Sequence, residues 1–565
     1  MKKEKTEEKK IKIKKELSEK QISRRFNIVA ILCIIIFCFA IAPISLQNDT
    51  FYTIKIGQDV MQNGINMEHD RYTWHDLPYT FPHWAYDVFI GFIFNCFGYW
   101  GIYFSTILLA CILGITLYLT QSKLSKNKLT SFLITIGAIY LLRNFIAARA
   151  QLVTFILFTL TIYCIEMFLR TKKKRYAISL VIIPILIANI HLAVWPFYFI
   201  LFLPYVVEYI IAWIRKSSLA YDVDIKRFKK KIKKLTENLD QKPDNKEKII
   251  KLEKKIEKLE QDKEKRQERV EKRDKNPYRL VIHKNDAGKW LIVIMLICIL
   301  TGLLTPLQGT PYTYLIKTME GNTTQNISEH LPLTLINSKD IMCYIIILLA
   351  ILIFTDTKIK LRDFFMIGGL LLLTFMSRRQ MSMFVLIGSF VLNNLICSLF
   401  DKYDPEGTNK FIKHMTSKLG IALTVGIVVL ASLGIFIPKR NSKFISKSSY
   451  PVDAVEYIKK NVDLTTMKIF NEYNNGSYLL LHDIPVFIDS RADLYTPEFN
   501  KGKDIFSDFI NISNINIYYE DKFEEYGITH VLIGKKSKLN LLLSRDDKYK
   551  ELYSDDDFVF YEREK

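Results

Sequence analysis

The chain has 565 residues, of which 49% are hydrophobic and 24% are charged, and its formal net charge is +21. The hydrophobic residues form blocks of about 20, the length of a membrane-spanning helix, which indicates a polytopic α-helical membrane protein. The positive charge follows the connections between these blocks, so it argues against a nucleic-acid-binding protein. The eight cysteines lie inside apolar segments without a CxxC pair and are typical of buried hydrophobic residues.

The chain begins with a basic segment, residues 1–25, that we interpret as a cytoplasmic lead-in. The apolar segment after it has no small-residue cleavage site and is too long for a signal-peptide core, so we expect a retained signal anchor. A shorter apolar stretch, Tyr86–Phe97, is interpreted as an interfacial or re-entrant helix. Eleven spans are predicted, near 26–46, 99–119, 128–143, 151–169, 177–190, 193–214, 290–305, 340–355, 362–376, 381–400 and 418–437.

The charges of the connections predict the orientation of the chain in the plasma membrane. With a cytoplasmic N-terminus, every inner connection is rich in Lys or Arg, as the positive-inside rule requires: 121–128, 170–175, 215–289, 356–362 and 401–414. The outer connections are then 47–85, 144–150, the residues around 191, 306–339, 377–380 and everything after 438. We therefore expect a first membrane half at 26–214 with an outer loop at 47–85, and a second half at 290–438.

The inner connection 215–289 is predicted to be a separate insert. Its apolar residues recur at intervals of three or four on two segments: Phe228, Ile232, Leu235 and Leu239, then Ile249, Leu252, Ile256 and Leu259. This spacing, with the turn sequence Lys-Pro-Asp-Asn at 242–245 between the segments, predicts a cytoplasmic antiparallel coiled-coil hairpin. The hairpin is either a solvated spacer or a docking arm for a partner, because its charges alone name no partner.

After Pro438 the composition changes, and residues 447–565 are predicted to form a small outer α/β domain. Helices are expected over 451–460 and near 538–553, and short strands at 468–470, 486–488, 529–533 and 558–561. Asp489, Arg491 and Asp493 alternate along an extended run and would share one face. They are interpreted either as polar contacts to an acceptor or to the first outer loop, or as a salt-bridge cluster that anchors the domain onto the bundle.

Ionisable residues are costly to bury near a membrane, so those on the predicted outer side are the candidates for function. A carboxylate there can act as a general base on a hydroxyl, and Arg can hold phosphate oxygens through its planar fork. Acids and arginines together suit transfer chemistry on a phosphate-linked lipid, although arginines in such places can also be interfacial residues that snorkel. The candidates include Asp49, Lys55, His69, Asp70, His83, Trp84, Arg149, His191, Glu329, His330, Arg378 and Arg379.

Several signals of soluble enzymes and metal sites are missing. The sequence has no phosphate-binding P-loop, no HExxH and no GxSxG. His69, His75 and His83 are spaced by six and eight residues, which does not place them on one helix face. No metal ligands are therefore assigned and no cofactor is required, with a divalent metal left open.

Three stretches occur in order along the chain. The first is NDTFYTIKIGQDVMQNG (48–64), continuing through HDRYTW (69–74) to PHWAYDV (82–88). The second is SRRQMSMF (377–384), and the third is IFNEYNNGSYLLLH (469–482) with PVFIDSRADLY (485–495). Together they resemble the first outer loop, a late span and the C-terminal outer α/β domain of bacterial GT-C-type membrane glycosyltransferase-like proteins. The resemblance covers most of the chain outside the insert.

This resemblance implies a GT-C-like fold and a sugar donor linked to polyprenyl phosphate, which enters laterally from the outer leaflet. The acceptor would be a surface polymer or a protein. Asp49 is implied as the base for the acceptor nucleophile, and Asp70 as a second acid that positions the acceptor or a metal. The phosphate would be held by Arg378, Arg379 or Arg149. Residues expected to bind substrate are Lys55, His69, His83, Trp84, Arg149, His191, Arg378 and Arg379.

A non-catalytic membrane component is the alternative, either a transporter or an assembly partner of a surface-polymer system. A transporter would be expected to show an internal repeat with broken helices in matching positions. The second half of the chain does not clearly repeat the first, which favours the enzyme.

Overall fold

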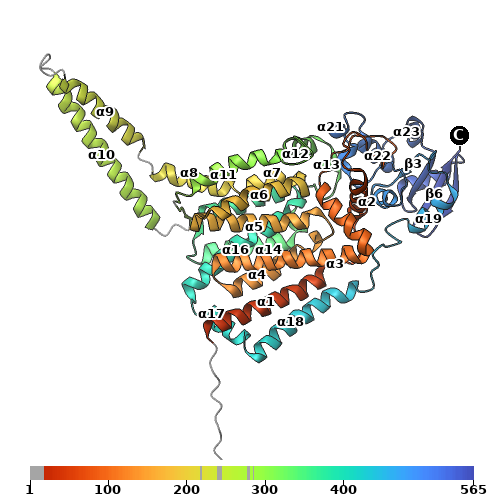
Figure 1. The fold of residues 1–565 in the computed structure, drawn as a ribbon, viewed down its shortest axis with the longest axis horizontal. Coiled ribbons are helices and arrows are strands. Elements are labelled where there is room, and N and C mark those ends of the chain that lie inside the picture. The colour runs from red at the N-terminus through yellow and green to blue at the C-terminus, as the bar shows by residue number, and fades with distance from the viewer. Residues whose placement is uncertain (1–17, 217–218, 238–244, 276–279, 284, 565) are drawn as a thin grey trace, which may run out of the picture.

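The computed structural model describes residues 18–216, 219–237, 245–275, 280–283 and 285–564. Figure 1 shows three parts in a row: a pair of long helices at one end, a helix bundle in the middle, and a part that contains a β-sheet at the other end. The mostly helical architecture predicted from the apolar blocks is therefore confirmed.

Each apolar block predicted as a span coincides with helix. Among the described residues, six helical segments are long and apolar enough to cross a membrane, and the count of eleven spans stays a prediction. Large rings such as Phe26, Phe155 and Phe384 fill the interior, whereas Leu108 and Leu430 are exposed, as lipid-facing residues would be. The bundle helices are α1 (Glu19–Ile41), α3 (Trp84–Ser125), α4 (Lys128–Leu141), α5 (Ala150–Thr171), α6 (Lys174–Ile190), α7 (Trp195–Ile200), α8 (Leu203–Lys216), α11 (Gly288–Ile299), α14 (Lys339–Phe354), α15 (Leu361–Met376), α16 (Met381–Tyr403), α17 (Gly407–Met415) and α18 (Lys418–Phe436).

The stretch Tyr86–Phe97 is helical but not separate from the span after it. It forms the first arm of α3, and Gly98 joins it to the second arm with a φ of 58°. A positive φ is readily adopted only by glycine, so Gly98 supports the change of direction. The predicted interfacial helix Tyr86–Phe97 and the predicted span 99–119 are thus two arms of α3, joined by a kink at Gly98.

The first outer loop, residues 47–85, begins with a helix, α2 (Asn48–Asn63). Asp49 lies in the first turn of α2, where a negative charge is favourable, and Phe51 and Ile54 are buried. The backbones of α2 and α3 approach so closely that a Cβ atom on Gly57 would lie 1.8 Å from the carbonyl oxygen of Asp87. This close packing fixes α2, and with it Asp49, on the end of the bundle.

The predicted outer segment 306–339 also contains helices that the sequence analysis did not anticipate. They are α12 (Thr310–Glu320), with Pro311 at its start, and the short α13 (Thr323–Asn326). Pro is compatible with a first helical turn, because its missing N–H has no partner there. Both helices lie at the bundle end that faces the sheet-containing part (Figure 1).

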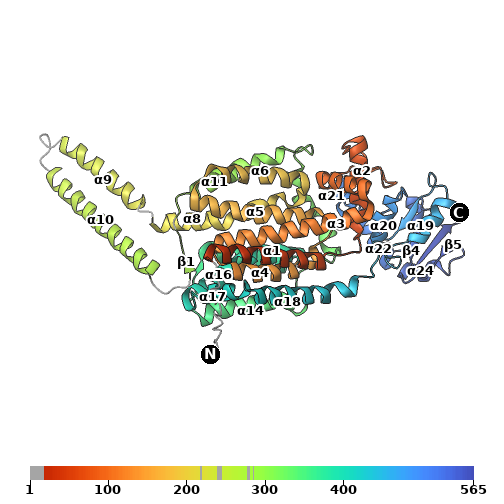
Figure 2. The same ribbon diagram turned by 60° about the horizontal axis from the view of Figure 1, so that its bottom comes forward.

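The insert emerges from the opposite end of the bundle (Figure 2). Its helices α9 (Leu219–Glu237) and α10 (Asn245–Lys275) lie side by side, with ion pairs from Lys263 to Asp222 at 2.6 Å and from Lys229 to Glu260 at 3.5 Å. The predicted turn at 242–245 lies outside the described residues except for its last residue, and the coiled coil stays a prediction. Beyond α10, strand β1 (Leu280–Val281) pairs in parallel with β2 (Ile359–Lys360).

The C-terminal part contains a four-stranded sheet in the order β3-β4-β6-β5. β3 (Ile469–Asn471) is parallel to β4 (His530–Gly534), and β6 (Phe558–Arg563) is antiparallel to β4 and to β5 (Tyr549–Ser554). The helices of this part are α19 (Val452–Asn461), α20 (Tyr473–Leu481), α21 (Pro497–Asn500), α22 (Ile505–Asn514), α23 (Tyr519–Tyr526) and α24 (Lys538–Leu543).

Residues 473–481 form α20. Two local expectations for this part are wrong. The stretch 538–553 is a short helix followed by β5 and not one helix. Val486–Ile488 joins no named strand, and Val486 makes only an isolated parallel bridge to Thr73 in the first outer loop. This short apolar run therefore contacts a distant loop and is not a sheet strand.

That loop is docked onto the C-terminal part by backbone and ring contacts. The backbone N–H of Val486 donates to the carbonyl of Tyr72 at 3.2 Å, and the Trp74 indole donates to the carbonyl of Ile469 at 3.2 Å. His75 Nε2 lies 2.9 Å from the Phe487 carbonyl oxygen, so this nitrogen carries the proton. The first outer loop and the C-terminal part are thus held together by a polar and aromatic interface.

Burial lowers the pKa of His75 to about 4, so His75 is neutral in the folded protein at pH 7. In the unfolded chain the ordinary pKa is 6.5, so the unfolded state binds more protons between pH 6.5 and 4 and stability falls as the pH drops through that window. We expect His75→Gln, which keeps a donor but cannot be protonated there, to weaken this pH dependence. The measurement is the unfolding temperature of the detergent-solubilised wild type and His75→Gln proteins at pH 7.5 and 5. An equal drop in unfolding temperature in the two proteins would contradict the role of His75 in this pH dependence.

Candidate active site

A cavity of about 820 Å³ lies between the end of the bundle and the C-terminal part. The start of α2, the loop before α3, the start of α5, the 191–197 segment, α12, the 324–330 loop and residues 373–380 line it from the bundle side. Residues 473–474, 490–494 and 499–510 contribute to the lining from the C-terminal part. Segments predicted to share the outer side of the membrane therefore meet at one cavity, while their orientation to the membrane stays a prediction.

Asp49 and Arg149 form an ion pair at the wall of this cavity. Arg149 Nη2 lies 2.9 Å from Asp49 Oδ2, and Arg149 Nη1 lies 3.8 Å from Glu329 Oε1. Both side chains of the first pair remain partly exposed, at 25% for Asp49 and 29% for Arg149. Asp49 thus presents a carboxylate to the cavity in an orientation that Arg149 fixes.

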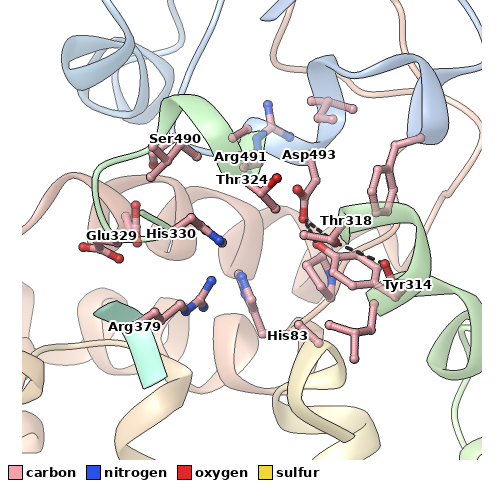
Figure 3. Close-up of a pocket in the computed structure, with 18 of the residues that line it drawn as sticks. His83, Tyr314, Thr318, Thr324, Glu329, His330, Arg379, Ser490, Arg491 and Asp493 are labelled. Carbon is pink, nitrogen blue, oxygen red and sulfur yellow. Dashed lines mark hydrogen bonds between the residues drawn. The ribbon is translucent and has the colours of Figure 1, made fainter. Parts of the chain in front are cut away.

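Arg379 contributes a second cation from the start of α16. Its hydrogen bonds in the described part of the chain involve its backbone, with the N–H donating to the Glu329 carbonyl at 2.9 Å. Figure 3 shows the guanidinium pointing toward His83 and His330. Burial and the charge of Arg379 lower the pKa of His330 to about 4, so this ring is neutral at pH 7 and available as a proton acceptor.

His83 and His191 complete the bundle wall of the cavity. His83 Nδ1 lies 2.8 Å from Asp87 Oδ1, and its Nε2 lies 3.1 Å from the Tyr52 hydroxyl. Burial acts to lower the pKa of His83, but the charge of Asp87 outweighs it and the pKa is raised. His191 is buried, and its Nδ1 lies 3.0 Å from the Thr154 hydroxyl. Both imidazoles are therefore held in fixed orientations.

Several residues expected at the site lie away from the cavity lining. Lys55 pairs with Asp483, and His69 pairs with Asp76 at 2.9 Å on an exposed part of the loop. Trp84 is partly buried among the apolar residues of the first loop. Arg378 is exposed, donates from Nε to the Pro332 carbonyl at 3.3 Å, and lines only a neighbouring hollow of about 250 Å³.

Asp70 is buried and ion-paired, which leaves it no open face toward an acceptor or a metal. Its carboxylate accepts from Arg491 Nη1 at 2.5 Å, and Arg491 also donates to Asp489 at 2.6 Å. The rings of Tyr79 and Tyr72 lie 4.7 Å and 5.3 Å from the same guanidinium. Arg491 itself lines the cavity, so Asp70 acts on the site through the position of Arg491. We call Asp70, Arg491 and Asp489 the Arg491 cluster.

Two further lining residues, Tyr314 and Thr318, were not expected from the sequence, and they contact Asp493, whose role the sequence left open. Asp493 Oδ2 accepts hydrogen bonds from the Tyr314 hydroxyl at 2.8 Å and from the Thr318 hydroxyl at 3.2 Å. Tyr314 and Thr318 are four residues apart, which places them on one face of α12. The helical spacing after Thr310-Pro311 was the signal that could have revealed this face.

The divalent metal that the sequence left open stays a prediction. In the described part of the chain, no group of three or more His, Cys, Asp or Glu side chains is placed to hold a metal ion. Arg149 already neutralises Asp49 at 2.9 Å and faces Glu329 at 3.8 Å, and a cation there would compete with that guanidinium.

The structure was compared with known proteins. Neither a protein-family model nor a curated protein matches the sequence. Among solved structures, the chain is similar to an oligosaccharyltransferase of Archaeoglobus fulgidus tethered to an acceptor peptide, with a TM-score of 0.51, 11% identity, and coverage of 96% of this chain and 74% of that one. The apo form of that enzyme gives a TM-score of 0.51, 10% identity, and coverage of 92% and 70%.

The chain shares the fold of this oligosaccharyltransferase. The GT-C-like fold expected from the three sequence stretches is thus confirmed at the level of architecture. At 10–11% identity the likeness concerns the fold alone, and the bacterial origin implied by the resemblance stays a prediction.

Removal of the Arg491 side chain leaves the buried carboxylates of Asp70 and Asp489 without their cation. Breaking a buried ion pair on one side costs about 3–5 kcal/mol, so we expect Arg491→Ala to lower the unfolding temperature markedly. Six of the eight cysteines are buried, so a thiol-reactive dye follows unfolding in detergent.

Lys447→Ala is the matched control, because Lys447 forms an exposed ion pair with Asp453 at 2.7 Å and exposed pairs contribute little. Equal unfolding temperatures for Arg491→Ala and Lys447→Ala would contradict a structural role for the Arg491 cluster.

Proposed function

We propose that the protein is a membrane glycosyltransferase that moves a sugar from a polyprenyl-phosphate donor to a surface acceptor. The observation that carries this proposal is Arg379, whose guanidinium faces a cavity of about 820 Å³ and whose hydrogen bonds in the described part involve only its backbone. A guanidinium free to form two parallel hydrogen bonds is well suited to phosphate oxygens. The similarity in fold to an oligosaccharyltransferase supports a transferase on a membrane scaffold.

Of the three arginines that the sequence offered for the phosphate, Arg379 fits best. Arg149 is engaged by Asp49 and Glu329, and Arg378 lies outside the large cavity. In the proposed complex Arg379 holds the donor phosphate, and His330, whose pKa is lowered to about 4, lies beside it as a neutral ring. Arg149 then orients Asp49, the proposed general base, and is not the main phosphate ligand.

In the proposed reaction the acceptor oxygen or nitrogen attacks the anomeric carbon of the donor sugar. The bond from that carbon to the phosphate oxygen breaks, and polyprenyl phosphate leaves with the electron pair. Arg379 stabilises the negative charge that develops on the leaving phosphate, which is the largest contribution that a fixed cation can make. Asp49 takes the proton released by the acceptor nucleophile, because its carboxylate faces the cavity and is held by Arg149.

The proposal includes the predicted orientation in the plasma membrane, with the N-terminus in the cytoplasm and the cavity at the outer face. The lipid bilayer then delivers the donor laterally, and the acceptor is a polymer or protein of the cell surface. The C-terminal part at 447–565 would lie outside as a cover over the cavity, and the 215–289 insert would lie inside as a spacer or docking arm.

We expect Arg379→Ala to lower turnover by about 10²–10³-fold, since removal of one group that stabilises transition-state charge has that effect. Arg379→Lys should recover part of the loss, because Lys keeps the charge but not the fork. The measurement is release of polyprenyl phosphate by the purified protein from a panel of polyprenyl-phosphate sugars.

Arg143→Ala is the matched control from the same end of the bundle. Arg143 contacts the Tyr140 ring at 4.2 Å and the Tyr140 carbonyl at 2.9 Å and does not line the cavity. Equal turnover in the Arg379→Ala and Arg143→Ala proteins would refute the phosphate site. Binding of polyprenyl phosphate without release of sugar from any donor would instead favour the non-catalytic membrane component.

Asp49→Asn tests the base, since the amide keeps the shape but cannot take a proton at neutral pH. We expect turnover to fall by about 10²–10⁴-fold, the usual contribution of a general base, with binding of polyprenyl phosphate retained. Weakened binding with turnover unchanged at saturation would show instead that Asp49 only shapes the cavity.

A further inference from the structure

The cavity has two walls of different chemistry. The bundle wall carries Arg149, Arg379, His83 and His191, together with the carboxylates of Asp49 and Glu329. The opposite wall, formed by α12 at the end of the bundle and by the C-terminal part, carries one carboxylate, Asp493, with hydroxyls and aromatic rings. Figure 3 shows Arg379 and His83 on one side and Asp493 and Thr318 on the other. The proposed phosphate site uses only the first wall and leaves the second without a role.

Asp493 is fixed at this second wall by neutral donors and not by an ion pair. Tyr314 and Thr318 both donate to Oδ2, which leaves Oδ1 without a hydrogen bond from either. Among the described residues no Lys, Arg or His atom lies within ion-pairing distance of Asp493, because Arg491 beside it is committed to Asp70 and Asp489. Burial raises the pKa of Asp493, and the hydroxyls of Tyr314, Thr318 and Thr323 and the charge of Arg379 oppose that rise.

Two phenylalanine rings pack against tyrosines of the cavity lining, and one of these tyrosines, Tyr314, donates to Asp493. Phe499 packs edge-on against Tyr314, with ring centroids 4.9 Å apart, and both line the cavity. Phe506 packs edge-on against Tyr473 at 6.2 Å and also lines it. A flat apolar face beside a carboxylate and hydroxyls matches a sugar ring, which has apolar C–H faces and a rim of hydroxyls.

We propose that Asp493, with Tyr314, Thr318 and the ring of Phe499, forms a subsite that binds a hexose ring through its hydroxyls. The inference rests on the proposed function in that it gives the transferred sugar, or the terminal sugar of the acceptor, a defined place opposite Arg379. Asp493 Oδ1 accepts a hydroxyl of the hexose, and the ring of Phe499 lies against its C–H face. The C-terminal part thereby selects the sugar, and the bundle holds the phosphate.

The test separates the two walls with three probes and measures equilibrium binding to the purified protein. Farnesyl phosphate carries no sugar, methyl hexosides carry no phosphate, and farnesyl-phosphate hexosides carry both. We expect Asp493→Asn to weaken the binding of both sugar-bearing probes by about 10–100-fold, which is the contribution of a hydrogen bond to a charged group. The affinity for farnesyl phosphate should stay unchanged. Arg379→Ala should weaken the binding of only the two phosphate-bearing probes.

Asp453→Asn is the control for a carboxylate of the same part that lies on α19 outside the cavity, and it should change nothing. Thr318→Val keeps the Asp493 charge but removes one of the hydrogen bonds that Asp493 accepts. It should therefore weaken hexoside binding less than Asp493→Asn does. Equal hexoside binding by the wild type and Asp493→Asn would overturn the subsite, as would the absence of binding by every methyl hexoside tested.

The same probes separate the subsite from the proposed function. If farnesyl phosphate does not bind but a methyl hexoside binds in an Asp493-dependent way, the phosphate site is wrong and the sugar subsite stands. If both the phosphate site and the sugar subsite bind their probes, competition between the probes shows whether the subsite holds the donor sugar or an acceptor sugar. Displacement of the methyl hexoside by a farnesyl-phosphate hexoside identifies the donor sugar, and simultaneous binding of both identifies an acceptor sugar.

Discussion

Arg491 joins segments that are 421 residues apart, because it pairs with Asp70 of the first outer loop and with Asp489 of its own part. A buried guanidinium between two buried carboxylates is stable only if all three stay together, since each group left alone would keep a charge out of water. The cavity wall at 490–494 and the loop that leads to His83 therefore depend on one electrostatic cluster. The geometry of the cavity therefore follows from the docking of the first outer loop onto the C-terminal part.

The ends of the bundle helices supply the other half of the same arrangement. α2 lies on α3 with almost no space between the backbones at Gly57, and α2 carries Asp49 to the guanidinium of Arg149. Arg379 enters from the start of α16, and Tyr314 enters from α12. Each of these side chains comes from a different helix, so the cavity exists only when the bundle is assembled.

Apolar blocks were sufficient to find the long bundle helices, because a membrane span requires a long and uniformly apolar segment. They did not reveal α2 or α12, whose buried faces are short and mixed with polar residues such as Asp49 and Thr318. The cost of burying charge near a membrane led to Asp49, Asp70, Arg149 and Arg379, and the resemblance implied their roles, but the partners of each charge were not readable from the sequence. Asp49 and Asp70 were both candidate acids, and only the contacts distinguish the buried Asp70, paired with Arg491, from Asp49, which faces the cavity.

The helix pair α9–α10 leaves the bundle at the end away from the cavity, and β1–β2 ties its exit to the start of α15 (Figure 2). A membrane protein of 66.2 kDa is a small particle for image alignment in electron cryomicroscopy. A rigid soluble domain grafted onto α9 and α10 would extend the particle into water along a direction set by two helices. The insert is thus a natural handle for a fiducial marker, placed where it leaves the cavity untouched.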